Sequence, residues 1–164
     1  MKYIILVLLL TVVSLTGCAT QSPTPMPLLV PTPTMLNNAV EETQVKSMVE
    51  NFGKHLAMVS LQSPLAPQDI ENQYSEFVSP ALLQTWINNP SQAPGRVVSS
   101  PWPDRIEINS LAKTDSDKYV VTGSVIQVTS VEIVNGGAAA KTPVRIVVQK
   151  IQGHWTITEY AETR

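Results

Sequence analysis

Residues 119–161 read YVVTGSVIQVTSVEIVNGGAAAKTPVRIVVQKIQGHWTITEYA, and this stretch decides the fold class of the chain. In residues 119–134 apolar side chains fall on both faces of the expected strand, with Val121, Val125 and Val131 on one and Val120, Ile126 and Val128 on the other, so both faces are at least partly covered. Asparagine and glycine accept the positive φ that tight hairpins require, so Asn135-Gly136-Gly137 and Gln152-Gly153 are expected turns. The turns separate three expected strands, over residues 119–134, 144–151 and 154–161. The carboxyl-terminal part of the chain therefore predicts an antiparallel sheet.

A further strand is expected before this stretch. Ile106 and Ile108 alternate with polar residues after Asp104, and the polar residues 114–117 supply a turn. Gly123 lies inside the long expected strand, where a glycine predicts a bulge or a sharp bend that curves the sheet. About four strands are expected in total.

Helical patterns occupy the region before the sheet. A first helix is expected from Asn38 to about residues 61–63, because apolar residues recur there every three or four positions and Asn38 with Glu41 suits a cap. A second is expected over residues 69–78. Ser79 caps a third helix that ends at residues 88–90, with Pro80 tolerated in its first turn. The apolar stripes of the three helices consist of Val45, Met48, Val49, Phe52, Leu56, Val59, Ile70, Tyr74, Phe77, Leu82, Leu83, Trp86 and Ile87.

The amino terminus has the features of an export signal. Lys2 precedes an apolar segment over residues 3–15, which is too short for a comfortable transmembrane helix of about 20 residues. Leu15-Thr16-Gly17-Cys18 follows at once and resembles a bacterial lipoprotein lipobox. The resemblance implies a diacylglyceryl group on the thiol of Cys18, with a further acyl chain such as palmitate on its amine, and anchoring in a bilayer. An ordinary signal peptide with an incidental cysteine and a short membrane anchor are the alternatives.

Residues 18–38 predict a tether between this anchor and the domain. Five prolines interleaved with threonines favour an extended segment, which would hold the domain away from the bilayer. A proline motif that binds a partner is the alternative. The expected organisation is a signal peptide over 1–17, the lipidated cysteine and tether over 18–38, and one α+β domain over 39–164.

Composition excludes several classes of protein. The 11 Lys+Arg and 13 Asp+Glu give a net charge of −2 without a basic run, so a nucleic-acid partner is not expected. One cysteine and two histidines leave no disulfide scaffold and no zinc site made by the protein. We expect no metal and no cofactor.

Three helices followed by a curved antiparallel sheet of about four strands resemble the cone-shaped fold of the nuclear transport factor 2-like (NTF2-like) group, also called cystatin-like. The resemblance covers residues 39–164 and rests on the order and lengths of the elements. Residues 93–108, APGRVVSSPWPDRIEI, are also similar to a stretch in uncharacterised lipoproteins and secreted proteins of spore-forming bacteria. The competing fold is a small open sheet packed by helices in another order.

The resemblance implies a pocket between the concave sheet and the helices. This scaffold hosts isomerases, dehydratases, binding modules and secretion-system assembly proteins, so it does not choose among functions. A pocket of this kind would be lined by Tyr74, Trp86 and Trp102. The sequence shows no Asp/His pair, nucleophilic serine elbow, phosphate loop or metal-ligand spacing, and we expect no enzyme.

The segment 94–105 is the strongest candidate for a ligand or partner surface. Trp102 stands between two prolines, and with Arg96 and Arg105 it would offer a planar cationic surface to a carboxylate, a glycan or a peptide. Alternatively Trp102 plugs the open end of the cone while Asp104 pairs with an arginine. The expected function is a non-catalytic binding or assembly module on the extracytoplasmic face of the cell membrane, anchored through Cys18 and paired with an envelope protein. A small-molecule-binding or weakly catalytic pocket protein and a purely structural spacer are the alternatives.

Overall fold

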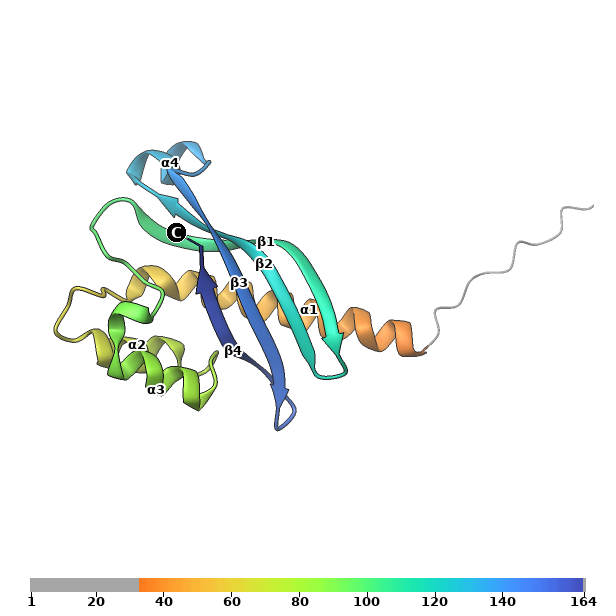
Figure 1. Ribbon diagram of the computed structural model, residues 1–164. Coiled ribbons are helices and arrows are strands. Elements are labelled where there is room, and N and C mark those ends of the chain that lie inside the picture. Colours follow the sequence, from red (N-terminus) through yellow and green to blue (C-terminus); the bar gives the residue numbers. More distant parts are fainter. Residues whose placement is uncertain (1–32, 164) are drawn as a thin grey trace, which may run out of the picture. The chain divides into compact units, whose positions relative to one another are not determined.

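The computed structural model describes residues 33–163, and the domain is α+β with one four-stranded antiparallel sheet (Figure 1). Three helices precede the sheet, as expected, and a fourth short helix interrupts it. The strands follow one another in the sheet in the order β1-β2-β3-β4. The elements in chain order are α1 (Pro33–His55), α2 (Ala66–Tyr74), α3 (Pro80–Asn88), β1 (Trp102–Asp115), β2 (Lys118–Val128), α4 (Ser130–Asn135), β3 (Ala140–Ile151) and β4 (His154–Glu162), with 3-10 turns at Leu56–Met58 and Pro90–Gln92.

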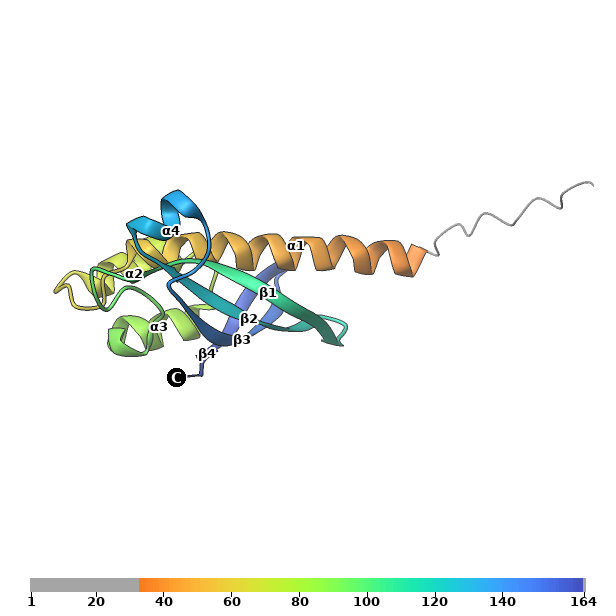
Figure 2. The ribbon, with the colours of Figure 1, turned by 90° about the horizontal axis from the view of Figure 1, so that it is seen from above.

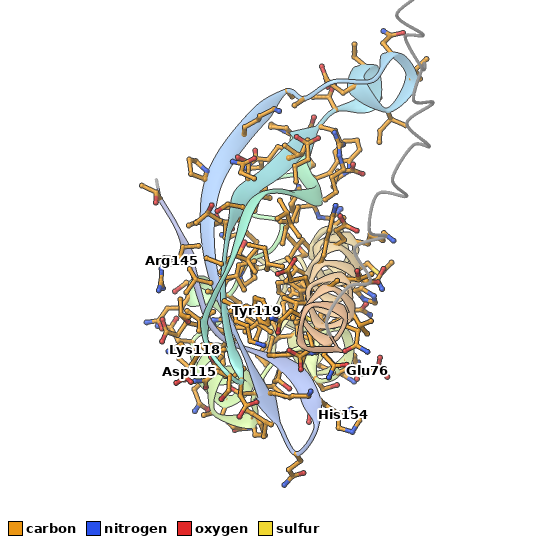
Figure 3. All side chains as sticks on the ribbon, turned by 90° about the vertical axis from the view of Figure 1, so that its right-hand side faces the viewer. Glu76, Asp115, Lys118, Tyr119, Arg145 and His154 are labelled. Atoms are coloured by element: carbon orange, nitrogen blue, oxygen red, sulfur yellow. The ribbon has the colours of Figure 1, made fainter. Side chains whose placement is uncertain are left out.

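Helix α1 packs along one face of the sheet (Figures 2 and 3). It begins at Pro33 rather than at the expected Asn38, because a proline fits the first turn of a helix and no breaker follows it. Its buried stripe includes Val45, Val49 and Phe52, which have no exposed surface. Tyr119 points from β2 toward α1 in Figure 3 and is fully buried, so α1 and the sheet share one core.

Glu41 ties the first half of α1 to two strands. Its carboxylate accepts hydrogen bonds from Lys113 of β1 at 2.9 Å and from Lys150 of β3 at 3.0 Å. Asn38, the expected cap of the helix, accepts a further bond from Lys113 at 2.9 Å. The two residues expected to cap α1 thus bind the sheet.

The expected strand over residues 119–134 is wrong in its second part. Strand β2 ends at Val128, and α4 follows, because Thr129 and Glu132 form a capping box. The Thr129 hydroxyl accepts from the Val131 N–H at 3.1 Å, and the Glu132 carboxylate accepts from the Thr129 N–H at 2.8 Å. These bonds satisfy backbone donors that a helix start would leave free, and they outweigh the strand preference of the valines. Strand β3 begins at Ala140 instead of Val144.

The irregularity expected near Gly123 is present, and the extra residue belongs to the partner strand. Ile108 pairs with Gly123 and Ser110 with Thr122, which leaves Asn109 as an additional residue in β1. A β-carbon at Gly123 would collide with the carbonyl oxygen of Glu107. Glycine is therefore required for the close approach of the two strands at this bend.

Four aromatic rings form the centre of the core beside α2 and α3. Phe52 lies 5.1 Å from Tyr74 and 6.4 Å from Trp86, and Trp86 lies 6.0 Å from Tyr160, measured between ring centroids. Such edge-on and offset contacts add to the stability that burial of the rings provides. None of the described helices combines the length and the apolar character needed to cross a membrane.

Candidate binding groove

A groove of about 630 Å³, open to solvent, lies between the segment 91–98 and the ends of β2, β3 and β4. One wall is the chain that leads from α3 into β1, including Pro101 and Pro103. The opposite side is formed by Gln127 of β2, Thr142 of β3 and residues 160–162 of β4. This volume falls within the range of known ligand sites, so the groove is the candidate site of the domain.

The wall is fixed by backbone hydrogen bonds. The Arg96 N–H donates to the Val59 carbonyl at 2.8 Å, and the Leu61 N–H donates to the Arg96 carbonyl at 2.9 Å. A β-carbon at Gly95 would stand 2.9 Å from the Val59 carbonyl oxygen, which is tighter than side chains allow. Behind the wall, the buried Tyr74 hydroxyl donates to the Pro94 carbonyl at 2.8 Å. The segment is therefore held in one shape before any ligand arrives.

The floor of the groove carries one charged group. Among the described residues that line the groove, Glu162 alone carries a charge, and its carboxylate accepts a hydrogen bond from the Tyr160 hydroxyl at 2.7 Å. Burial, followed by the neighbouring Glu162 charge, raises the pKa of Tyr160 well above its ordinary value, so the hydroxyl keeps its proton and continues to donate. Within residues 33–163 no lysine, arginine or histidine forms an ion pair with Glu162.

Apolar side chains line the same groove as this carboxylate. Val97 and Val98 line the groove and are 51% and 55% exposed, so they are accessible from solvent. Gln127 and Thr142, which form a 3.4 Å hydrogen bond to each other, add neutral polar groups. The groove therefore combines two exposed valine side chains, neutral polar groups and a single negative charge.

Two of the residues predicted for the site lie in the core. Tyr74 is fully buried and Trp86 is 2% exposed, and neither lines the groove. Burial raises the pKa of the Tyr74 hydroxyl far beyond its ordinary value. Tyr74 still acts on the groove indirectly, through its bond to Pro94.

The predicted arginines occupy different surroundings. Arg105 forms ion pairs with Asp104 at 2.9 Å and with Glu107 at 2.7 Å, and Glu107 also binds Lys141 at 3.1 Å. The hydrogen bond to Asp104, and then that to Glu107, raises the pKa of Arg105. The guanidinium thus already has two carboxylate partners. Arg96 does not line the groove, and its backbone holds the wall segment through the bonds to Val59 and Leu61.

Trp102 belongs to β1, where it pairs with Val128 of β2, and it does not line the groove. Cys18 lies outside the described residues. Among residues 33–163, no three His, Cys, Asp or Glu side chains gather closely enough to hold a metal ion.

Tyr160 and Glu162 were missed by the reasoning from sequence. Their spacing of two in the last expected strand places them on one face of the sheet, a signal that was available. Val97 and Val98 gave no such signal, because residues 93–98 lack a regular period.

Comparison with known proteins gives no family for the chain. No family model matches it, and no curated protein matches it. Among solved structures, it is similar to the intermembrane space region of chloroplast protein ARC6, with 16% identity and a TM-score of 0.40 over 76% of this chain and 95% of that one. It is also similar to a variant of Rd1NTF2_05, an NTF2-like designed protein, with 13% identity and a TM-score of 0.38 over 77% of this chain and 99% of that one. At these TM-scores neither likeness decides a function.

Proposed function

We propose that this chain is a lipid-anchored lipoprotein of the cell envelope whose NTF2-like (cystatin-like) domain is a non-catalytic binding or assembly module. The lipobox-like segment ending at Cys18 supports the anchor, and the order of three helices before a four-stranded sheet supports the family. The likeness of residues 93–108 to uncharacterised lipoproteins and secreted proteins of spore-forming bacteria agrees with export from the cytoplasm. The domain would then act outside the cytoplasm, on an envelope protein.

One observation carries the binding role, namely the groove with a prearranged wall. Segment 91–98 is held by hydrogen bonds to Val59, Leu61 and Tyr74, so binding would not have to order it. A site that is already ordered loses less conformational entropy when a partner binds. Because the groove opens to solvent, it suits the surface of another protein better than chemistry that requires exclusion of water.

The anchor is tested by replacing the acylated residue. In Cys18→Ser the thiol that would receive the diacylglyceryl group is gone, so we expect loss of incorporated radioactive or clickable palmitate and release of the protein from washed membranes. Unchanged labelling would contradict the anchor.

The binding role is tested by site-specific photocrosslinking in intact cells. A photoreactive residue at Val98 stands at the groove rim, whereas one at Glu159 stands on the opposite face, where Glu159 pairs with Arg145 at 3.2 Å. We expect one reproducible protein adduct from position 98 and none from position 159. Equal adducts from both positions, or none from either, would contradict a partner at the groove.

The second candidate is a small-molecule-binding or weakly catalytic pocket protein. The observation that favours it is the Tyr160–Glu162 pair, a hydroxyl donor beside a carboxylate. Turnover of a small molecule that Glu162→Gln abolishes would establish this candidate in place of the first.

A further inference from the structure

The outer edge of β4 is unpaired where it borders the groove. The Thr163 N–H donates to the Pro143 carbonyl of the β3 side, and Glu162 stands opposite Val144. Because backbone groups alternate in direction along an antiparallel ladder, the N–H and C=O of Tyr160 and Glu162 point away from β3. Within residues 33–163, no backbone group accepts from or donates to them on that side.

The same edge is already used for pairing a few residues earlier. The Ile157 N–H donates to the Phe77 carbonyl and the Ser79 N–H donates to the Ile157 carbonyl, each at 2.8 Å. Val78 thereby forms a parallel bridge with Ile157. This short segment ends before the groove, and beyond it the edge has no backbone partner among residues 33–163. Unpaired edges of this kind accept an extended chain as an added strand.

The negative charge of Glu162 favours a basic side chain in such a strand. Residues 160 and 162 face the same side of β4, so a residue paired beside Glu162 would place its side chain next to that carboxylate. The Tyr160 hydroxyl occupies one side of the carboxylate, and no cation of residues 33–163 pairs with it. A lysine or arginine side chain complements this charge, and flanking apolar residues complement Val97 and Val98.

We propose that the groove binds an extended peptide segment of a partner protein, which adds to the free edge of β4 at Tyr160 and Glu162 and places a lysine or arginine against Glu162. The inference rests on the proposed function, since it names the partner surface that the binding module recognises. Backbone hydrogen bonds to residues 160 and 162 supply the extended geometry. The Glu162 carboxylate supplies the preference for a basic side chain.

Charge recognition is tested with blocked pentapeptides and the full-length acylated chain in detergent micelles. The probe has a central lysine between valines, and matched probes carry norleucine or glutamate at that place. We expect binding of the lysine peptide, and a loss of about tenfold with norleucine or with Glu162→Gln, because one charge-assisted contact is removed. Glu159→Gln is the matched control in the same strand and should leave the affinity unchanged, since Glu159 faces the other side. Equal affinity for the lysine and norleucine peptides, or an equal loss in both variants, would overturn the charge assignment.

Strand addition is tested with N-methylated versions of the lysine peptide. The backbone N–H groups of every second residue of an added strand point toward β4, and those of the residues between them point away. Methylation of the first set of nitrogens should abolish binding, and methylation of the second set should leave binding intact. Tolerance of both sets, or sensitivity to both, would overturn edge pairing. If the Val98 crosslink to a partner is obtained but no peptide binds, this inference fails while the proposed function stands. If neither is obtained, both fail.

Discussion

Glu41 connects one helix to two strands that are not neighbours in the sheet. The hydrogen bonds from Lys113 and then from Lys150 hold the pKa of Glu41 below its ordinary value. A carboxylate with a lowered pKa in the folded state stabilises the fold above its unfolded pKa of about 4.3, and this stabilisation is lost as the pH falls through the folded pKa. We expect Glu41→Gln to lower the melting temperature at pH 7, and the difference from the unsubstituted protein to narrow as the pH falls from 5 toward 3. Thermal melts from pH 3 to 8 measure this, and a difference that stays constant over that range would refute the role of the charge.

Removal of the buried hydroxyl should destabilise the protein more at Tyr74 than at Tyr119. Tyr74→Phe leaves the buried Pro94 carbonyl without its donor, so we expect a loss of about 1–3 kcal/mol in the free energy of unfolding. The hydroxyl of Tyr119 has no hydrogen-bond partner among residues 33–163, so Tyr119→Phe removes a polar group without breaking a bond and should cost less. Urea unfolding of both variants makes the comparison. An equal or larger loss of unfolding free energy in Tyr119→Phe would show that the Tyr119 hydroxyl has a hydrogen-bond partner.

At the scale of elements, the sequence predicts helices and strands whose apolar residues recur at a regular spacing. It mispredicts the end of a strand where a helix cap interrupts that spacing. The stripe of α1 and the presence of β1, β3 and β4 could be predicted, because apolar residues recur there at the spacing of a helix face or lie in strand-forming runs bounded by turns. The end of β2 could not be predicted from alternation, since the valines after Thr129 continue it. The Thr129–Glu132 spacing was the contrary signal, and it prevails because it satisfies free backbone donors.

Helix α4 should therefore depend on its cap and on little else. It contains no buried residue, and Val134 is 81% exposed, so tertiary packing contributes little to its stability. We expect Thr129→Ala to weaken α4 locally by about 1 kcal/mol while the urea midpoint of the domain stays unchanged. Hydrogen exchange of the amides of residues 130–135 measures the local effect. A large shift of the urea midpoint would contradict this independence.

At the scale of the whole molecule, the fold class could be predicted from the order of the elements, whereas the groove could not. Its wall comes from residues 91–98 and its floor from residues 160–162, which lie far apart in the sequence. The contacts that fix the wall, such as Tyr74 with Pro94 and Arg96 with Val59, depend on a non-repeating loop. Sequence reasoning selected the loop but assigned its chemistry to Trp102 with Arg96 and Arg105. In the structure the charged group of the groove is Glu162.

The most direct measurement is amide hydrogen exchange of the full-length protein in the presence of cell membranes, compared with the purified full-length protein alone. If the groove receives an envelope partner, exchange should slow in the membranes at residues 91–98 and at the free-edge amides of Tyr160 and Glu162. The exposed helix α4 should exchange equally in both samples. Equal exchange at the groove in both samples, or slowing confined to α4, would contradict the groove as the binding site.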